Sequence, residues 1–340
     1  MNWKSKVLTL AVLSAVAFCR SASAQGAPAT ILDIELDNMV NYFDDVTDYS
    51  KLAANPNRTT VAAQPNFAQS IGIGDIVSVN GKPVKGLFTE RRIQLTRRVD
   101  PGAGQAIADA QRGAVMERHY EILKLDGTQI SSIATTGMGS GSPPPGAPLG
   151  VSDASFIIIG GNGAFLGARG QASSSPLNST LPDARNASMA ENPRNRRMLG
   201  GGGRRHFILH VIPLFRPEVV IAASGPAVVH SSDFSPVTAA KPARPGELLS
   251  LFATGLGPTE PGVDPGKPFP ASPLSFANSP IDVTVNGQAA EVLYAGGYPG
   301  TTDTYQVNFR VPSGITSGPA SLQISAAWIA GPEVKIPVQQ

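Results

Sequence analysis

The fold is decided by one stretch, residues 157–170, which reads IIIGGNGAFLGARG. An apolar β-branched run enters a glycine-rich turn and leaves through alternating large and small residues. Glycine is favoured where φ is positive or where two strands approach closely. The stretch therefore predicts two strands joined by a tight turn. The residues expected to serve this hairpin structurally are Gly160, Gly161, Gly163, Gly167 and Arg169.

Strand patterns continue on both sides of this hairpin. Asn80-Gly81 and Asp126-Gly127 are dipeptides typical of hairpin turns, and each lies between two apolar runs. The predicted strands are 30–36, 71–79, 84–98, 115–125, 129–137, the two strands of the 155–174 hairpin, and one within 204–222. About eight strands favour one closed up-and-down barrel, because closure removes exposed strand edges.

The predicted strand 84–98 alternates between apolar and polar side chains. Leu87, Ile93 and Leu95 share one parity, and we expect this side to be buried. The opposite parity carries the polar residues Glu90, Arg92, Gln94 and Arg98, and we expect it to face water.

A segment rich in Ser, Asn, Pro and Gly interrupts the barrel at residues 175–205. It lacks hydrophobic periodicity and apolar mass, so we predict a disordered insertion. Its basic cluster consists of Arg194, Arg196, Arg197, Arg204 and Arg205, and Arg185 adds a further positive charge. This cluster is either a solvated loop or an electrostatic contact for an anionic polymer.

The chain changes character near residue 226. Short strands then follow one another with regular turn signals, and Asn286-Gly287 marks a clear hairpin. This pattern predicts a second all-β domain, a β-sandwich of the immunoglobulin type, over residues 226–340.

The glycine-rich stretch resembles the G-G-T-G-x-F-x-x-A-R-G signature of the dirigent and allene oxide cyclase barrels, with Asn162 at the threonine position. The resemblance implies an eight-stranded barrel over residues 25–225, a homotrimer and a cavity for a small apolar ligand. Plant members guide phenoxy-radical coupling or cyclise an unstable epoxide. Only the glycine hairpin and Arg169 match, so no catalytic residue is carried over.

The C-terminal part resembles a second family, the Solibacter-type Ig-like C-terminal domain of secreted bacterial proteins. The matching residues are Ala253–Pro258, Val292–Gly296, Tyr305–Asn308 and Val311-Pro312. This resemblance implies an accessory role outside the cell and no catalytic residue.

The N-terminus has the pattern of a signal peptide. Lys4 and Lys6 precede the apolar stretch 7–18, and Ala22-Ser23-Ala24 fits the cleavage pattern. We therefore expect residues 1–24 to be removed, together with Cys19, the single cysteine, and the protein to be secreted. The remaining chain carries 24 basic and 25 acidic residues, which favours neither nucleic acid nor an anionic membrane. No other apolar run is long enough to span a membrane.

Two groups of side chains are weak candidates for chemistry. Glu117, His119 and Glu121 alternate on one strand, and His206 and His210 share a face of another. Facing the barrel interior, these groups could transfer protons or bind zinc. The alternative is that Glu117–Glu121 is the wet face, with Tyr120 and Ile122 packed inward, and that the histidines are structural.

Asp44, Asp45 and Asp48 have ligand types suited to calcium, but they lack the EF-hand spacing and favour turn roles. No sequence pattern indicates a cofactor or a metal. The leading hypothesis is a secreted, non-enzymatic protein that binds a small apolar ligand or an extracellular polymer. The rival is a lyase or isomerase acting on a small apolar substrate in the barrel. An apolar pocket with convergent polar groups inside the barrel would favour the enzyme, and a filled interior would favour the binding protein.

Overall fold

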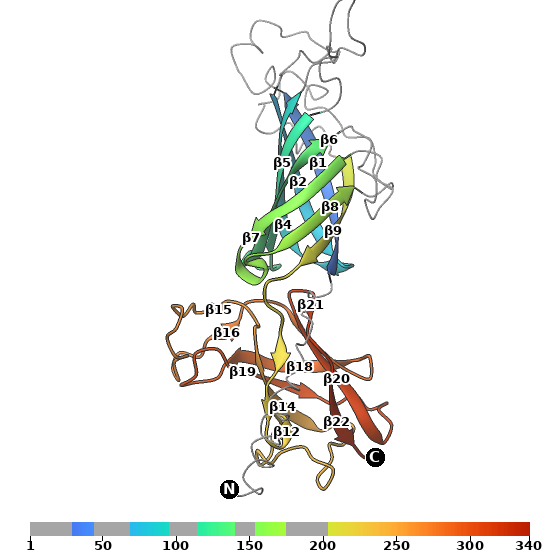
Figure 1. The fold of residues 1–340 in the computed structure, drawn as a ribbon, viewed down its shortest axis with the longest axis vertical. Coiled ribbons are helices and arrows are strands. Elements are labelled where there is room, and N and C mark those ends of the chain that lie inside the picture. The colour runs from blue at the N-terminus through green and yellow to red at the C-terminus, as the bar shows by residue number, and fades with distance from the viewer. Residues whose placement is uncertain (1–28, 44–68, 95–113, 140–153, 175–202) are drawn as a thin grey trace, which may run out of the picture.

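The structure, a computed structural model, describes residues 29–43, 69–94, 114–139, 154–174 and 203–340. It places a β-barrel at one end of the molecule and a second, curled sheet at the other (Figure 1). Within the described residues, no helix has the length and apolar character needed to cross a membrane. The all-β prediction is confirmed.

The barrel is a closed antiparallel sheet of eight long strands. Its order is β1-β9-β8-β7-β6-β5-β4-β2, and β1 pairs with β2 to close the ring. Each strand therefore lies beside its neighbours in the chain, which is the predicted up-and-down arrangement. The strands are β1 (Thr30–Phe43), β2 (Gln69–Val79), β4 (Lys85–Gln94), β5 (Ala114–Leu123), β6 (Gln129–Gly139), β7 (Ala154–Gly161), β8 (Arg169–Ser174) and β9 (Gly203–Ile212), and the short β3 (Lys82–Pro83) extends the β2 hairpin.

Aromatic side chains fill the middle of the barrel. Phe88, Tyr120, Phe156 and Phe207 are all buried. The ring of Phe88 stacks on Phe207 at 5.1 Å between centroids and meets the edge of Tyr120 at the same distance. Aliphatic side chains complete this core, among them Leu32, Ile34, Leu36, Met39 and Ile76. At this level the barrel is a packed interior rather than a channel.

The predicted faces of the strand 84–98 are reversed in β4. Leu87 is exposed and Ile93 is half-buried on the outside, whereas Phe88, Glu90 and Arg92 have the inward parity. The prediction placed Glu90 and Arg92 in water because charged side chains are usually exposed. The pattern of one strand does not show that the neighbouring strand supplies an opposite charge. Glu90 is held inside by a guanidinium from β5, described below.

The connection between β7 and β8 is longer than the predicted tight turn. It spans residues 162–168 and contains one 3₁₀ turn, η1 (Gly163–Phe165). Asn162 anchors it to β6, because the Ser132 amide donates to the Asn162 side-chain oxygen at 2.6 Å. The Phe165 side chain from this turn is fully buried in the barrel core.

Strand β9 differs from its prediction at both ends. It begins at Gly203, so Arg204 and Arg205, assigned above to the insertion, belong to the barrel wall. It ends at Ile212, because Pro213 and Pro217 interrupt the strand predicted to reach residue 222. The rest of the predicted insertion, 175–202, and the acidic residues 44–48 lie outside the described residues.

The C-terminal strands form one curled sheet in the order β10-β14-β19-β18-β17-β20-β21. It begins at β10, before the boundary predicted at 225/226, and its core includes Leu251, Val307, Phe309, Leu322 and Ile324. The strands are β10 (Glu218–Val219), β13 (Val228–His230), β14 (Leu248–Thr254), β15 (Thr259–Glu260), β16 (Phe276–Ala277), β17 (Ile281–Val285), β18 (Gln288–Gly297), β19 (Tyr305–Arg310), β20 (Gly318–Ala326), β21 (Ile329–Ala330) and β22 (Val334–Val338), with β11 (Ile221–Ala222) and β12 (Gly225–Pro226) as a separate pair. Asn286 and Gly287 form the predicted hairpin turn, with φ of 48° and 75°.

A hairpin of the C-terminal sheet reaches into one end of the barrel. Its turn, between β20 and β21, is formed by Ala327 and Trp328, both with positive φ. Ala327 and Ile329 are buried in the same hydrophobic cluster as the barrel core, and Trp328 packs against it. Lys82 and Asp282 also form an ion pair of 2.6 Å across this junction. The C-terminal sheet therefore covers the end of the barrel that carries the short hairpins (Figure 1).

Candidate functional site

The two sequence-predicted groups lie on the outer wall of the barrel. Glu117 and His119 are exposed and Glu121 is half-buried, while Tyr120 and Ile122 point inward. His206 and His210 are half-buried on the outward parity of β9, and Phe207, Leu209 and Val211 fill the inside. His210 lies beside Gln171 of β8 and Ile31 of β1 in the sheet.

The outward placement keeps these groups apart from one another. His206 contacts the Asp33 carboxylate of β1, and Glu117 pairs with Arg91 at 3.6 Å. Among the described residues, no group of three or more His, Cys, Asp or Glu side chains is placed to hold a metal ion. The structure does not bring His210, His119 and Glu117 into one site.

The glycine-rich hairpin has clear structural demands at most of its predicted positions. Gly163 has φ of +55°, and a Cβ there would lie 2.5 Å from the Ile130 carbonyl. A Cβ on Gly161 would meet the Ser132 carbonyl at 2.6 Å, and one on Gly167, φ +71°, would meet Leu214 at 2.7 Å. Gly160 differs, because the nearest atom to an added Cβ is 4.0 Å away.

Arg169 closes the same connection from outside. Its guanidinium donates to the carbonyls of Ile159, Gly167 and Ala168, at 3.1, 3.4 and 2.9 Å. A single long side chain therefore satisfies three backbone acceptors of the turn. These three bonds tie the turn to the start of β8.

The sequence reasoning missed a charged network inside the barrel. Arg118 of β5 is 5 % exposed and Glu90 of β4 is 2 % exposed. Arg118 Nε donates to Glu90 Oε2 at 2.6 Å, and Arg92 Nη2 donates to Glu90 Oε1 at 3.0 Å. One signal was present in the sequence: Arg118 shares the parity of Met116, Tyr120 and Ile122.

Two arginines keep the Glu90 carboxyl group ionised. Burial by itself raises the pKa of Glu90, but the attraction of Arg118 and Arg92 and their hydrogen bonds outweigh it. The net pKa of Glu90 lies below its ordinary value. A carboxylate held in this way is a poor proton donor at neutral pH.

Aromatic rings hold the Arg118 guanidinium in place. Its Cζ lies 3.7 Å from the centroid of the Phe156 ring and 4.9 Å from that of Phe207. These are cation–π distances, so the rings offset part of the cost of burying the charge. The Tyr120 hydroxyl lies beside the Arg118 guanidinium, and burial raises the pKa of Tyr120 to about 12.

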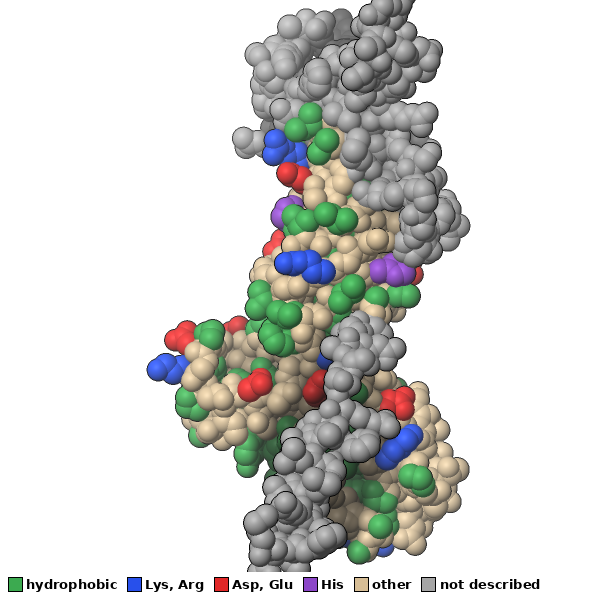
Figure 2. Space-filling model, in the orientation of Figure 1, with side chains coloured by type: hydrophobic (Ala, Val, Ile, Leu, Met, Phe, Trp, Pro, Cys, Tyr) green, Lys and Arg blue, Asp and Glu red, His purple; other side chains and the backbone are tan. Residues whose placement is uncertain are grey.

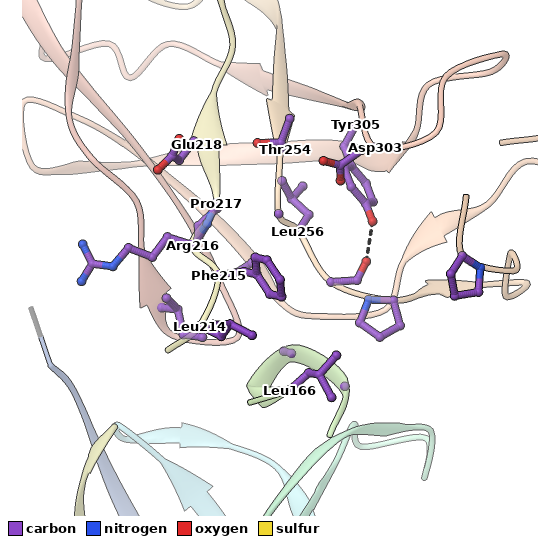
Figure 3. Close-up of a pocket in the computed structure, with 18 residues that line it drawn as sticks. Leu166, Leu214, Phe215, Arg216, Pro217, Glu218, Thr254, Leu256, Asp303 and Tyr305 are labelled. Atoms are coloured by element: carbon purple, nitrogen blue, oxygen red, sulfur yellow. Dashed lines mark hydrogen bonds between the residues drawn. The ribbon is translucent and has the colours of Figure 1, made fainter. Parts of the chain in front are cut away.

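A pocket of about 680 Å³ lies at the junction of the barrel and the C-terminal sheet (Figure 3). Its barrel side is the η1 connection, represented by Leu166, and its other side is the Gly255–Pro258 loop. Residues 214–217, in the chain between the two sheets, form a third wall and place Phe215 between Leu166 and Leu256 (Figure 3).

The mouth of this pocket is apolar. Leu166, Leu214 and Phe215 are 58, 60 and 63 % exposed, which is unusual for three large apolar side chains so close together. Polar groups lie on the sheet side, where Tyr305 donates to the Gly257 carbonyl at 2.5 Å and the Asp303 carboxylate is exposed, and Arg216 adds a charged group from the connecting chain. Apolar walls with a few polar groups are typical of small-molecule sites.

No family model matches this chain, and a search of curated proteins gives no match. Function is therefore inferred from the sites themselves.

Proposed function

We propose that this chain is a secreted, non-enzymatic binding protein that holds a small apolar ligand in the pocket between the barrel and the C-terminal sheet. The proposal rests on one observation: large apolar side chains are left exposed around a pocket of ligand size. Pockets of roughly 300–1,000 Å³ with apolar walls bury most of a small ligand.

The barrel interior supports binding rather than catalysis. Packed aromatic rings occupy its middle, and the Glu90 carboxylate that lies among them is held by two arginines. The histidines proposed as acid–base groups face outward. Because its pKa lies below the ordinary value, the Glu90 carboxylate is a weak base as well as a poor proton donor at neutral pH.

The family assignments belong to this proposal as well. The glycine hairpin and Arg169 support a dirigent-like barrel, and the C-terminal motifs support an Ig-like accessory domain. Secretion is inferred from the N-terminal sequence pattern. A secreted two-domain protein with an exposed apolar pocket is suited to capturing small apolar molecules outside the cell.

The proposal is tested with N-phenyl-1-naphthylamine, a neutral apolar dye that fluoresces when its surroundings become apolar. Trp328 lies next to Ile329 of the pocket wall, and the other tryptophan, Trp3, is in the predicted signal peptide. In the chain without residues 1–24, energy transfer from Trp328 to the dye therefore reports binding near the junction. We expect saturable binding with energy transfer.

A matched pair of variants locates the site. Phe215→Ser removes the aromatic wall, and we expect it to weaken dye binding at least tenfold. Phe234→Ser is the control, because Phe234 is 57 % exposed but lies outside the pocket, and we expect less than a twofold change. Equal effects of the two variants, or binding without energy transfer, would contradict the proposal.

A further inference from the structure

Inside the barrel, two guanidinium groups share one carboxylate. Glu90 accepts from Arg118 through Oε2 and from Arg92 through Oε1, so each oxygen already has a charged donor. Arg118, Arg92 and Glu90 together carry a net charge of +1. An unbalanced buried charge is costly unless something compensates it.

The Arg118 guanidinium has an unused edge. Its flat face is covered by Phe156, its Nε donates to Glu90, and its Nη2 contacts the Met116 sulfur at 3.7 Å. Nη1 is buried and makes no hydrogen bond of good geometry among the described residues, and the Tyr120 hydroxyl lies beside this guanidinium. The N–H groups of a guanidinium lie in its plane, so this edge is directed away from the aromatic ring.

Arg92 repeats this arrangement nearer the far end of the barrel. Its Nε is also buried without a hydrogen-bond partner in the described part of the chain. The side chain is 27 % exposed, compared with 6 % for Arg118, so the network becomes more open along β4. On β2, the residue paired with Glu90 is Gly72, which presents no side chain at this level.

We propose that this network is a binding site for a monoanionic carboxylate, in which the unused N–H groups of Arg118 and Arg92 are the donors. A carboxylate matches the planar guanidinium edge and accepts more than one N–H group. A single negative charge balances the +1 of the network, whereas a dianion would leave an excess negative charge inside the barrel. This site is separate from the apolar pocket at the junction.

Sodium benzoate is the probe, compared with sodium chloride and sodium phosphate at matched ionic strength. Calorimetric melting of the full protein measures the effect, because a ligand that binds only the folded state raises the midpoint temperature with concentration. We expect benzoate to raise the midpoint and chloride and phosphate to have no such effect. An equal response to all three salts would overturn the proposal.

Three variants locate the effect. Arg118→Met keeps the length of the side chain and removes the donors, and we expect it to abolish the benzoate response. Arg92→Gln provides an independent test if Arg118→Met does not fold, and it should weaken the response at least tenfold. Arg91→Gln is the control, because Arg91 points outward and pairs with Glu117.

The control should keep the full benzoate response. An unchanged response in Arg92→Gln, or an equal loss in Arg91→Gln, would overturn the assignment. Phe215→Ser should leave the benzoate response intact, so failure of the apolar pocket and failure of this site are distinguishable.

Discussion

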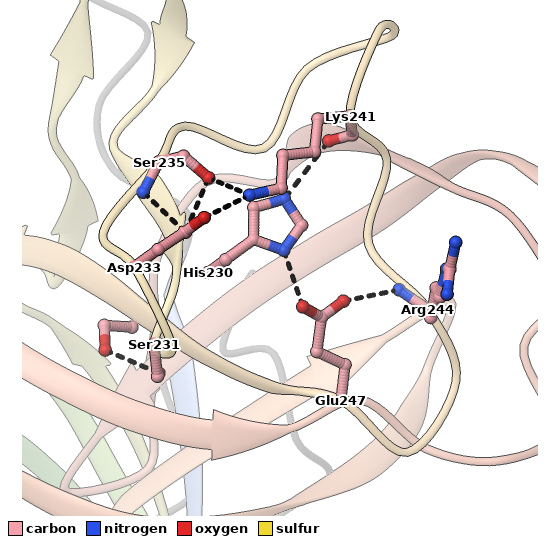
Figure 4. A network of polar contacts seen from close by, with 8 residues as sticks. His230, Ser231, Asp233, Ser235, Lys241, Arg244 and Glu247 are labelled. Atoms are coloured by element: carbon pink, nitrogen blue, oxygen red, sulfur yellow. Dashed lines mark hydrogen bonds and ion pairs between the residues drawn. The ribbon is translucent and has the colours of Figure 1, made fainter.

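The barrel and the C-terminal sheet each bury an ionisable side chain, but its hydrogen-bonding groups are satisfied to different extents in the two regions. In the sheet, His230 is 3 % exposed, and its Nδ1 lies 2.6 Å from Glu247 Oε1 while its Nε2 lies 3.2 Å from the Lys241 carbonyl oxygen (Figure 4). The other Glu247 oxygen accepts from the Arg244 amide at 2.9 Å. In the barrel, Arg118 and Arg92 each keep one buried donor without a partner among the described residues.

The sheet network is therefore a structural one, whereas the barrel network keeps donors that a ligand could use. Both ring nitrogens of His230 lie within hydrogen-bond distance of an oxygen, so neither polar atom of the ring is left without a contact. Nearby, Lys241 binds Asp233 and Ser235, both at 2.5 Å, which ties the same loop together. In the sheet network both nitrogens of the buried ring have a contact, whereas in the barrel network Arg118 Nη1 and Arg92 Nε have no hydrogen bond of good geometry among the described residues.

The largest expected effect comes from removing the acid of each network. Glu90→Gln leaves two guanidinium groups in the barrel without a counter-charge, and we expect it to lower the free energy of unfolding by roughly 3–5 kcal/mol. Glu247→Gln in the partly exposed network of the sheet should cost about 1–2 kcal/mol. Urea unfolding at pH 7 measures both, and equal losses would remove the distinction.

The effect of Glu90→Gln on stability should depend on pH. The pKa of Glu90 is lowered in the folded protein, so its contribution to stability is present above the ordinary pKa of a glutamate and is lost as the pH falls through the folded pKa. The stability gap between the wild type and Glu90→Gln should therefore narrow below about pH 4. A gap that stays constant down to pH 3 would show that the charge of Glu90 is not what stabilises the barrel.

A smaller effect is expected from the histidines of the two regions. His230→Gln breaks contacts at both ring nitrogens and should lower the free energy of unfolding by about 2 kcal/mol. His210→Gln on the barrel wall should cost less than about 1 kcal/mol, because its buried Nε2 has no hydrogen-bond partner in the described structure. Thermal melting of the two variants side by side measures the difference, and a larger loss for His210 would reverse it.

The smallest effect at neutral pH is expected from the tyrosines. Tyr120 makes no hydrogen bond of good geometry among the described residues, so Tyr120→Phe should leave stability at pH 7 nearly unchanged. Tyr305→Phe loses the bond to Gly257 and should cost about 1 kcal/mol.

Alkaline pH provides the second half of this test. Burial raises the pKa of both hydroxyls to about 12, so the wild type should lose stability as the pH rises above the ordinary tyrosine value of about 10. Each variant should remove about 1.4 kcal/mol of the loss between pH 9 and 11. Unfolding curves at the two pH values measure it, and a loss that persists in both variants would point to other groups.

The sequence predicted much of the fold because alternation along single strands carries most of the information. Strand β5 follows simple alternation. Tyr120 and Ile122 point inward, and Glu117 and His119 point outward, as in the alternative that made residues 117–121 the wet face. The Asn286-Gly287 turn likewise follows from local backbone preference.

The charged network could not be predicted in the same way. Glu90 looks like a residue of the wet face until the register pairs it with Arg118, and this register is set by contacts between strands rather than by either strand alone. The pocket was missed for a related reason. Leu166, Phe215 and Leu256 lie far apart in the chain and meet only when the two sheets are placed together.

The outer face of the barrel adds a feature that parity alone does not explain. Ile157 and Ile159 of β7 are exposed at 54 and 49 %, and Figure 2 shows apolar side chains scattered over this face. They alternate with polar neighbours such as Gln171 and Arg169 on β8. Single exposed apolar residues are common on protein surfaces, so they contribute no site here.

The hairpin turn of Ala327 and Trp328 has a consequence for how such proteins can be recombined. Because Ala327 and Ile329 complete the hydrophobic core of the barrel, exchanging the C-terminal sheet for another would uncover that core unless the replacement carried an equivalent turn. The two sheets therefore cannot be exchanged as independent modules, although their sequences read as two separate domains. In an evolving lineage, substitutions at the tip of this hairpin and in the barrel end that receives it should be selected together.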